Sequence, residues 1–343
     1  MKRVSFFMMA SIAIAMTSCT KELASDSVSS SASELAVPGT ITTPKLSLSA
    51  NTMNYGAWVL SPYESTDTAG FGFVMDVAGS LGLPCLRDIT PVPGVKKVKT
   101  LSTQYNVLLN FLSNKPKPMI FRTDTTAYKA DLESTLAALC GNPTMAIIEN
   151  EESNKGYYSG SALDYIKQLK AAITVMHSHG IPVTNGGLTS VGLKYLVYQD
   201  YVSRGMTTQA NDYKKRMGIA VNNADTKDRG TYESVLISNY AKMNLDYVNF
   251  HWRSSTAADA QGLGETIDYL QRATGKKVIT TEIGQYDQDP ATLTATVNMC
   301  KSYNFPYIIW YSGNEDHRSY PLQFDNESLT QTGFTYRDLV ASK

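Results

Sequence analysis

From about residue 51 onward, short apolar runs alternate with longer amphipathic stretches, the pattern expected of parallel strands joined by helices. Eight apolar runs can be counted, and most gaps between them are about 30 residues, enough for one helix and two loops. The runs centre on Tyr55, Leu86, Ile120, Ile147, Val183, Val248, Ile279 and Ile308. The sequence therefore predicts an α/β fold, a single (β/α)8 TIM barrel that spans residues 51–343.

Helical spacing and turn residues support this division. Apolar residues at helical spacing predict one helix around Tyr105–Leu112 and another over Leu163–Met176. Glycine or proline stands where each helix must end before the next strand, at Gly82, Pro118, Gly180, Pro182, Gly275 and Pro306. No glycine-rich phosphate loop follows the first run, so a closed barrel is favoured over an open, doubly wound sheet.

The gap between the fifth and sixth runs is longer than the others. We expect residues 190–230 to form an extended loop insertion after strand five. Loops of this kind lie over the carboxyl ends of barrel strands, so the insertion either shapes one wall of a substrate cleft or is a solvated excursion. Within it, Asp225–Gly230 lacks the ligand spacing of a calcium loop, and we expect a turn there.

The beginning of the chain has the features of an export signal. Lys2 and Arg3 precede an apolar run, Phe6–Met16, that is too short to span a bilayer. The segment Met16–Cys19 resembles the lipobox of bacterial lipoproteins. This resemblance implies cleavage before Cys19 and acylation of its new N-terminus. A plain secretory signal that is cleaved elsewhere is the alternative.

Three regions follow from these features: a signal peptide at 1–18, a serine-rich tether at 19–50 and the barrel at 51–343. The resemblance implies an exported, lipid-anchored protein at the outer membrane or cell surface of a Gram-negative bacterium. Contact with the membrane is then expected through the anchor only.

Charge and cysteine usage exclude several classes of function. The chain has 31 basic and 31 acidic side chains and a formal net charge of zero, which argues against nucleic acid as a partner. Cys85, Cys140 and Cys300 lie in apolar surroundings, so we expect buried free thiols with at most one disulfide. His177 and His179 suit the negative end of a helix dipole better than a metal. We expect no metal and no cofactor.

Two of the predicted strands end in glutamate. The fourth run ends at Glu149-Asn150-Glu151 and the seventh at Thr281-Glu282. Polar residues at the carboxyl ends of barrel strands point into the mouth of the barrel. Hydrolysis of a glycoside with retention needs two carboxyl groups about 5 to 5.5 Å apart, one as proton donor and one as nucleophile. The structural alternative is that the two glutamates form unrelated salt bridges.

Several short motifs, taken in order, resemble those of the clan A retaining glycoside hydrolases, which are (β/α)8 barrels. The fourth strand carries Asn150-Glu151 and the seventh Thr281-Glu282-Ile283-Gly284. The other landmarks are Leu81–Asp88 at strand two, Asn249-Phe250-His251-Trp252 at strand six, Ile308–Tyr311 at strand eight and Leu329–Leu339 at the last helix. The resemblance covers nearly the whole barrel.

The resemblance implies catalytic roles for both glutamates. Glu151 is the acid/base, whose pKa we expect to be raised so that it is protonated. Glu282 is the nucleophile and must be ionised, with Arg87 as the nearby cation. Glu149 and Glu152 are neighbouring acids, but the asparagine before Glu151 is the feature that matches.

Three further residues are expected to contact substrate. Asn150 is expected to donate to the sugar 2-hydroxyl, and Trp310 to form a flat apolar floor under the sugar. His251 resembles the histidine of a His-any-Tyr motif that shapes the sugar site. Here the third position is Arg253, so either Trp252 or another tyrosine fills that place, or the nucleophile is supported differently.

These features together predict a monomeric enzyme that hydrolyses an extracellular, β-linked oligosaccharide or polysaccharide by double displacement. The alternative is a non-catalytic surface glycan-binding lipoprotein on the same type of barrel. A lyase or aldolase would need a lysine or a metal at a strand end, and the sequence offers neither there.

Overall fold

The protein is described here by a computed structural model, which covers residues 53–63, 68–93, 104–113, 117–139, 141–313 and 321–342. The predicted signal peptide, Cys19 and the tether lie outside these ranges, as do Cys140 and the segment 314–317 that follows the last strand. Among the described residues, no helix combines the length and the apolar character needed to cross a bilayer.

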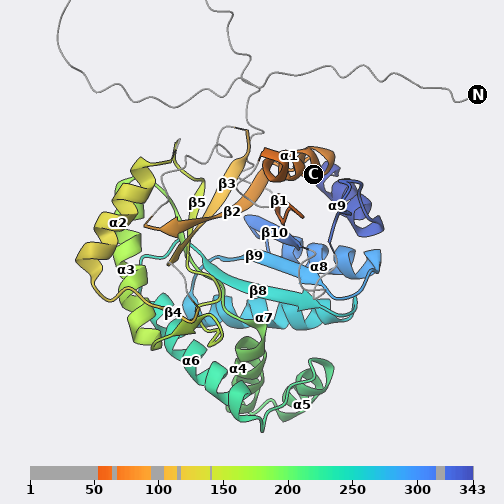
Figure 1. Cartoon of the computed structure of the whole chain (residues 1–343). Helices are drawn as coiled ribbons and strands as arrows, with labels where there is room; N and C mark the ends of the chain where they lie inside the picture. Colours follow the sequence, from red (N-terminus) through yellow and green to blue (C-terminus); the bar gives the residue numbers. More distant parts are fainter. Residues whose placement is uncertain are drawn as a thin grey trace, which may run out of the picture. The chain divides into compact units, whose positions relative to one another are not determined.

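Eight parallel strands form the central sheet, and helices surround it (Figure 1). The sheet order is β7-β5-β3-β2-β1-β10-β9-β8, and two parallel bridges, Thr184 to Tyr247 and Leu188 to Phe250, link its outer strands. The strands are β1 (Asn54–Val59), β2 (Cys85–Val92), β3 (Asn106–Ser113), β5 (Met145–Ile148), β7 (Val183–Asn185), β8 (Val248–Ser254), β9 (Val278–Gln285) and β10 (Tyr307–Ser312). The predicted (β/α)8 barrel is confirmed.

The helices alternate with the strands as expected, except that none is described between β2 and β3. They are α1 (Thr68–Ser80), α2 (Thr125–Ala137), α3 (Ala162–Ser178), α4 (Ser190–Ser203), α5 (Thr207–Arg216), α6 (Ala224–Tyr240), α7 (Asp259–Thr274), α8 (Pro290–Ser302) and α9 (Gln331–Ala341). Their ends carry the capping signals of the sequence. Ser161 and Asp164 form a capping box at α3, and Asp289 caps α8 with Pro290 in its first turn.

The third barrel strand is not where the sequence predicted it. The strand is β3 at Asn106–Ser113, the segment read as a helix, whereas Ile120 belongs to the two-residue strand β4 (Met119–Ile120), which pairs with β6 (Tyr158–Ser159) outside the barrel. A parallel strand buried on both faces has a continuous apolar run, and in so short a run helical spacing arises by chance.

The interval after the fifth strand is helical, so the predicted loop insertion is not confirmed. Residues 190–240 contain α4, α5 and α6, and α6 packs between α3 and α7. Asp225–Gly230, predicted as a turn, lies within α6. α4 packs against α6, α7 and β8, whereas α5 lies at the outside of the ring of helices (Figure 1). The interval therefore extends the helical layer sideways.

Strand alternation sorts the core into two layers. A small inner layer fills the barrel with Cys85, Leu108, Met145, Ile147, Ile279 and Ile309. The larger outer layer lies between strands and helices and includes Trp252 and Trp310. Above the inner apolar layer, Asn185, Asn249 and Thr281 tie β7, β8 and β9 together by hydrogen bonds of 2.7 to 3.2 Å. Cys85 and Cys300 are buried free thiols, as predicted.

Candidate active site

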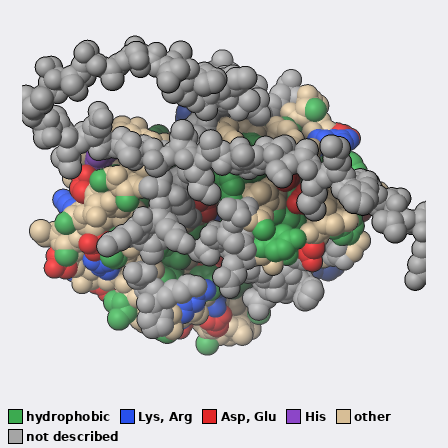
Figure 2. Space-filling view, turned by 45° about the horizontal axis from the view of Figure 1, so that its top comes forward, with side chains coloured by type: hydrophobic (Ala, Val, Ile, Leu, Met, Phe, Trp, Pro, Cys, Tyr) green, Lys and Arg blue, Asp and Glu red, His purple; other side chains and the backbone are tan. Residues whose placement is uncertain are grey.

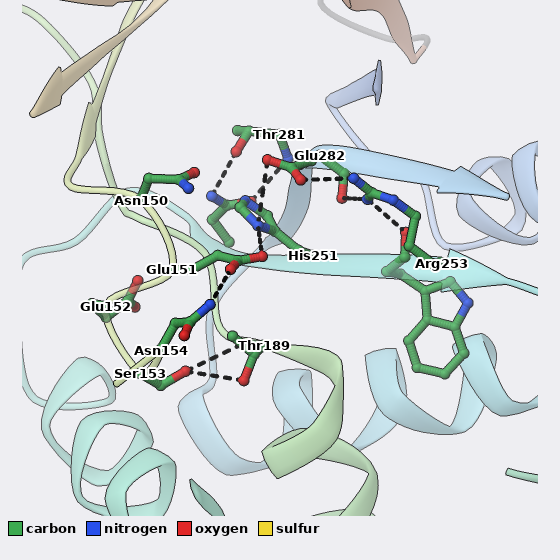
Figure 3. Close-up of polar contacts among 12 residues, drawn as sticks. Asn150, Glu151, Glu152, Ser153, Asn154, Thr189, His251, Arg253, Thr281 and Glu282 are labelled. Atoms are coloured by element: carbon green, nitrogen blue, oxygen red, sulfur yellow. Dashed lines mark hydrogen bonds and ion pairs between the residues drawn. The ribbon is translucent and has the colours of Figure 1, made fainter. Parts of the chain in front are cut away.

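Polar side chains meet at the carboxyl ends of the strands, directly above this layer (Figure 3). They come from β2, the loop after β5, β8 and β9, so residues far apart in the chain share one site. The structure brings together five of the predicted residues: Arg87, Asn150, Glu151, His251 and Glu282.

A β-bulge in β9 directs Glu282 into the barrel. Opposite β8, the register passes from Asn249 with Ile279 to His251 with Glu282, so one extra residue of β9 fits into this step. Regular alternation from the inward-facing Ile279 would turn Glu282 towards the helices. Bulges change the direction of a side chain in this way and are frequent beside active sites.

Two arginines bind the carboxylate of Glu282. Arg87 Nη1 lies 2.9 Å from Oε2, and Arg253 Nη2 lies 2.7 Å from Oε1. Burial alone would raise the pKa of Glu282, but the positive charges of His251, Arg253 and Arg87 outweigh it and lower the pKa to about 2. Glu282 is therefore ionised, as predicted for a nucleophile.

Glu151 lies in the loop after β5, where its backbone has a φ of 53°. Its Oε1 is 3.1 Å from His251 Nδ1, and its Oε2 accepts a hydrogen bond of 2.8 Å from Asn154 Nδ2. A positive φ is unusual for glutamate, and such backbone strain is concentrated at functional sites. The side chain is 19% exposed, so solvent and a substrate can reach it.

The predicted raised pKa of Glu151 is wrong. Burial and the charge of Glu282 raise the pKa, but the hydrogen bond and charge of His251, with the hydrogen bond from Asn154, lower it below the ordinary value. This could not be predicted from the sequence because His251 is 100 residues from Glu151 and reaches it only through the fold. Proton donation by Glu151 is therefore favoured at acidic pH.

The two carboxyl groups lie close enough to share one substrate atom. One oxygen each of Glu151 and Glu282 and one nitrogen of His251 all lie within 4.8 Å of one another. Such a set could ligate a divalent cation, but both oxygens of Glu282 already pair with guanidinium groups, which would repel it. The arrangement therefore fits carboxyl chemistry better than metal binding.

His251 stands between the two glutamates. Its Nδ1 is 3.1 Å from Glu151 and 3.7 Å from Glu282. The ring packs against Gly187, where an added Cβ would lie only 2.2 Å from Nε2. Gly187 has a φ of 116°, so this close approach depends on glycine.

Asn150 is anchored beside the two carboxyl groups. Its Oδ1 accepts a hydrogen bond of 2.6 Å from Arg87 Nη2, and its backbone N–H donates to Tyr158 Oη at 3.0 Å. With Oδ1 held by the arginine, Asn150 offers Nδ2 as a donor. This is the group expected to contact a sugar hydroxyl.

Trp310 does not form the floor of the site, so this prediction is wrong. Its side chain is fully buried in the outer layer, where it packs against Tyr336 with ring centroids 5.7 Å apart. The side chain of the neighbouring Tyr311 points into the barrel, because successive side chains of a strand alternate in direction. Its ring lies edge-on to that of Trp58 of β1, with the ring centroids 5.4 Å apart. Trp58 and Tyr311 are partly exposed, so they are the aromatic side chains of the mouth.

Sequence analysis named Arg253 without giving it a role, and it missed Asn154 and the aromatic pair. Trp58 stacks on the guanidinium of Arg87 at 4.1 Å, and Tyr311 on that of Arg253 at 4.7 Å. The sequence did indicate that Arg253 belongs to the site, because it is two residues from His251 and therefore lies on the same face of the strand. For Asn154 the sequence carried no signal.

The other acids near Glu151 are buried away from the mouth. Glu149 accepts hydrogen bonds from Ser113 and Tyr158, and Glu152 accepts from Asn185 at 2.7 Å and Tyr240 at 2.6 Å. Burial raises the pKa of both carboxyls, and neither forms an ion pair among the described residues. The choice of Glu151 as the glutamate of the site therefore fits the geometry.

Solved structures of glycoside hydrolases of family GH128 share this fold. An endo-β-1,3-glucanase from Amycolatopsis mediterranei, in complex with laminaritriose, matches with a TM-score of 0.52 and 11% identity over 84% of this chain and 99% of that one. An endo-β-1,3-glucanase from Sorangium cellulosum matches with a TM-score of 0.52 and 13% identity over 83% and 97%.

A structure described as an oligosaccharide-binding protein from Trichoderma gamsii is similar to the same degree, with a TM-score of 0.52 and 12% identity over 87% of this chain and 98% of that one. No protein-family model and no curated protein matches the sequence. At these identities the likeness establishes a shared barrel fold, and function has to be argued from the site.

Proposed function

We propose that the protein is a retaining glycoside hydrolase that cleaves a β-1,3-linked glucan, with Glu282 as nucleophile and Glu151 as acid/base. The observation that carries this proposal is the approach of the two carboxyl groups across the mouth, with oxygens within 4.8 Å. This spacing suits attack by one carboxylate on the anomeric carbon, whereas an inverting enzyme needs room for a water between them.

In the first step a Glu282 oxygen attacks the anomeric carbon, and the bond to the departing glycosidic oxygen breaks. Glu151 gives its proton to that oxygen, and a covalent glycosyl ester remains on Glu282. Asn150 Nδ2 donates to the sugar 2-hydroxyl, and Trp58 and Tyr311 supply apolar faces near the ring.

In the second step Glu151 takes a proton from water, the water oxygen bonds to the anomeric carbon, and the ester bond breaks to restore the Glu282 carboxylate. The negative charge of Glu282 raises the pKa of Glu151. Because the ester is neutral, this influence disappears in the intermediate and the pKa of Glu151 falls. The same residue therefore becomes a better base when a base is needed.

The substrate class is supported by the structural neighbours. The Amycolatopsis enzyme is described as an endo-β-1,3-glucanase in complexes with laminaritriose and laminarihexaose. On the described part of the face drawn in Figure 2, acidic and basic side chains are intermixed with hydrophobic ones. A neutral glucan suits such a surface better than a polyanion does.

A second candidate is a glucan-binding protein without turnover, which the likeness to the Trichoderma gamsii protein favours. Binding alone does not require two facing carboxyls, one of which is held ionised by two arginines. This argument makes hydrolysis the first choice.

The test is incubation of the purified protein with laminarin, curdlan and laminari-oligosaccharides. We expect new reducing ends from the unchanged protein and at least a thousandfold loss of turnover in Glu282→Gln, with retained binding. Thermal unfolding of this variant should remain cooperative but at a lower Tm, because two guanidinium groups lose their carboxylate partner. Binding without turnover by both proteins would favour the second candidate. Turnover that survives in Glu282→Gln would remove Glu282 from the role of nucleophile.

We also propose that the protein is exported and held at a membrane by acyl chains on Cys19. Two or more acyl chains give stable anchoring, because each buried methylene contributes about 0.8 kcal/mol. Cys19→Ala should release the protein into the soluble fraction of cells that express the full chain. A variant that still sediments with membranes would contradict the anchor.

A further inference from the structure

The residue two positions after His251 differs from the one found in the clan A glycoside hydrolases, whose motifs were used to predict the roles of the site residues. That resemblance expects a tyrosine there, and the chain has Arg253. Arg253 is fixed from three sides: Nη2 binds Glu282 Oε1 at 2.7 Å, Nη1 donates to the carbonyl of Trp252 at 3.2 Å, and the guanidinium stacks on Tyr311 at 4.7 Å. A tyrosine would donate one neutral hydrogen bond, whereas arginine adds a full charge.

Four charged or titratable groups face Glu282. Arg87 comes from β2, His251 and Arg253 from β8, and Glu151 from the loop after β5. Arg87 has no exposed side-chain surface, and the Arg253 side chain is 15% exposed. Both charges therefore act on the carboxylate through a poorly solvated path, where Coulomb interactions are strong.

The two half-reactions change the charge of Glu282 in opposite directions. Formation of the ester removes the negative charge, and breakdown of the ester restores it. A cation beside the carboxylate therefore opposes the first step and favours the second. Its repulsion of the positively charged sugar is common to both transition states and does not change their ratio.

We propose that Arg253 is a positioning residue that acts through Glu282 and sets the balance between the two steps, so that the glycosyl ester breaks down as fast as it forms. This inference rests on the proposed function. It predicts that the substitution which removes the charge makes Glu282 a stronger nucleophile and a poorer leaving group.

The experiment compares the unchanged protein with Arg253→Gln and Arg253→Lys. With a dinitrophenyl β-laminaribioside, Arg253→Gln should release a burst of close to one dinitrophenolate per protein before a slow steady state, and the unchanged protein a much smaller burst. On laminarin, kcat/KM of Arg253→Gln should fall about fourfold more between pH 5 and pH 3 than that of the unchanged protein, because a rise of the Glu282 pKa from about 2 by about one and a half units leaves only about a quarter of the carboxylate ionised at pH 3. Arg253→Lys keeps the charge and should stay near the unchanged protein in both measurements.

Arg216→Gln is the matched control, because it removes an arginine that pairs with Glu265 on α7 at 2.8 Å, outside the site. It should alter neither the burst nor the pH profile. If Arg253→Gln does not fold, Arg253→Met, which keeps the aliphatic contact with Tyr311, gives the same expected result. The inference would be overturned if Arg253→Gln showed the same burst and the same fall in kcat/KM at low pH as the unchanged protein. It would also be overturned if Arg253→Lys behaved like Arg253→Gln. Absence of turnover by the unchanged protein would instead remove the proposed function, and the inference with it.

Discussion

Single residues in this site act through the partners that the fold gives them. Glu151 follows β5 and Glu282 lies in β9, yet one is held by an imidazole and an amide and the other by two guanidinium groups. Identical side chains therefore receive different electrostatic surroundings, which is how a pair of carboxyls divides the roles of acid and nucleophile. The role of Glu151 can be tested separately.

Glu151→Ala should lose at least a hundredfold in kcat on laminari-oligosaccharides, because no proton donor remains for the departing oxygen. Azide should restore turnover of the dinitrophenyl glycoside and yield a β-glycosyl azide, since the small anion fits the vacated volume and needs no base. Rates with and without azide, together with the product, are the measurement. Glu152→Gln, which changes a buried neighbour, should not respond to azide. A Glu151→Ala variant that azide leaves inert would contradict the assignment.

The sequence correctly predicted site residues that follow apolar runs. It failed where a side chain could point either into the barrel or towards the helices, because the alternation along the strand decides that direction. Arg87, Glu151 and Glu282 follow apolar runs and were found at the mouth. Trp310 was placed wrongly because the parity of β10 is fixed by Ile309 inside the barrel, which turns Tyr311 inward and Trp310 outward. The bulge in β9 that turns Glu282 inward leaves no mark in the sequence.

Among the elements, short loops of strained backbone hold the site together. The loop after β7 passes so close to the loop after β5 that a Cβ at Gly186 would lie 2.7 Å from the backbone of Glu149, and Gly187 supports His251. Glu149 and Glu151 themselves have φ values of 65° and 53°. The site therefore depends on the mutual fit of these two loops.

Gly187→Ala should move His251 away from Glu151, because the new methyl group would overlap the ring at 2.2 Å. We expect at least a tenfold loss of kcat and a loss of about 1–3 kcal/mol in the free energy of unfolding. Gly275→Ala is the matched control, since Gly275 has a φ of 67° but nothing within 4 Å of an added Cβ. It should lower stability by about 1 kcal/mol and leave activity unchanged. Equal kinetics for the two variants would refute the supporting role of Gly187.

At this scale the sequence predicted seven of the eight strands at their places and misread β3 as a helix. The length of each segment and the difference between its apolar and polar faces explain this result. α3 has an unbroken apolar stripe over 17 residues, whereas β3 has only eight residues with apolar side chains on both faces. Of the helices after β7, α5 and α6 were missed because their sequences are polar.

The barrel domain also contains three buried carboxyl groups that form no ion pair among the described residues: Glu149, Glu152 and Glu233. Glu233 binds Ser153 and Thr189 at 2.7 Å and so joins α6 to the loop that carries Glu151. Burial raises the pKa of Glu233 to about 8. Its neutral form is therefore the one that the fold accommodates.

A raised pKa makes stability depend on pH in one direction. Glu233 is protonated in both states below its ordinary pKa, but above it the unfolded chain loses the proton first, so stability falls as the pH rises towards 8. Glu233→Gln cannot ionise and should flatten the fall in Tm between pH 5 and pH 8. Thermal unfolding at several pH values measures this, and the difference in Tm between variant and parent should grow with pH. Parallel curves would contradict the assignment.

The central claim is that two facing carboxyls carry out double displacement at one anomeric carbon. Proton NMR of the first product formed from a laminari-oligosaccharide, recorded before mutarotation, tests it most directly. Two inversions at the same carbon predict that the new reducing end appears as the β-anomer. An α-anomer as first product would mean that water attacks directly, and it would contradict the role of Glu282 as nucleophile.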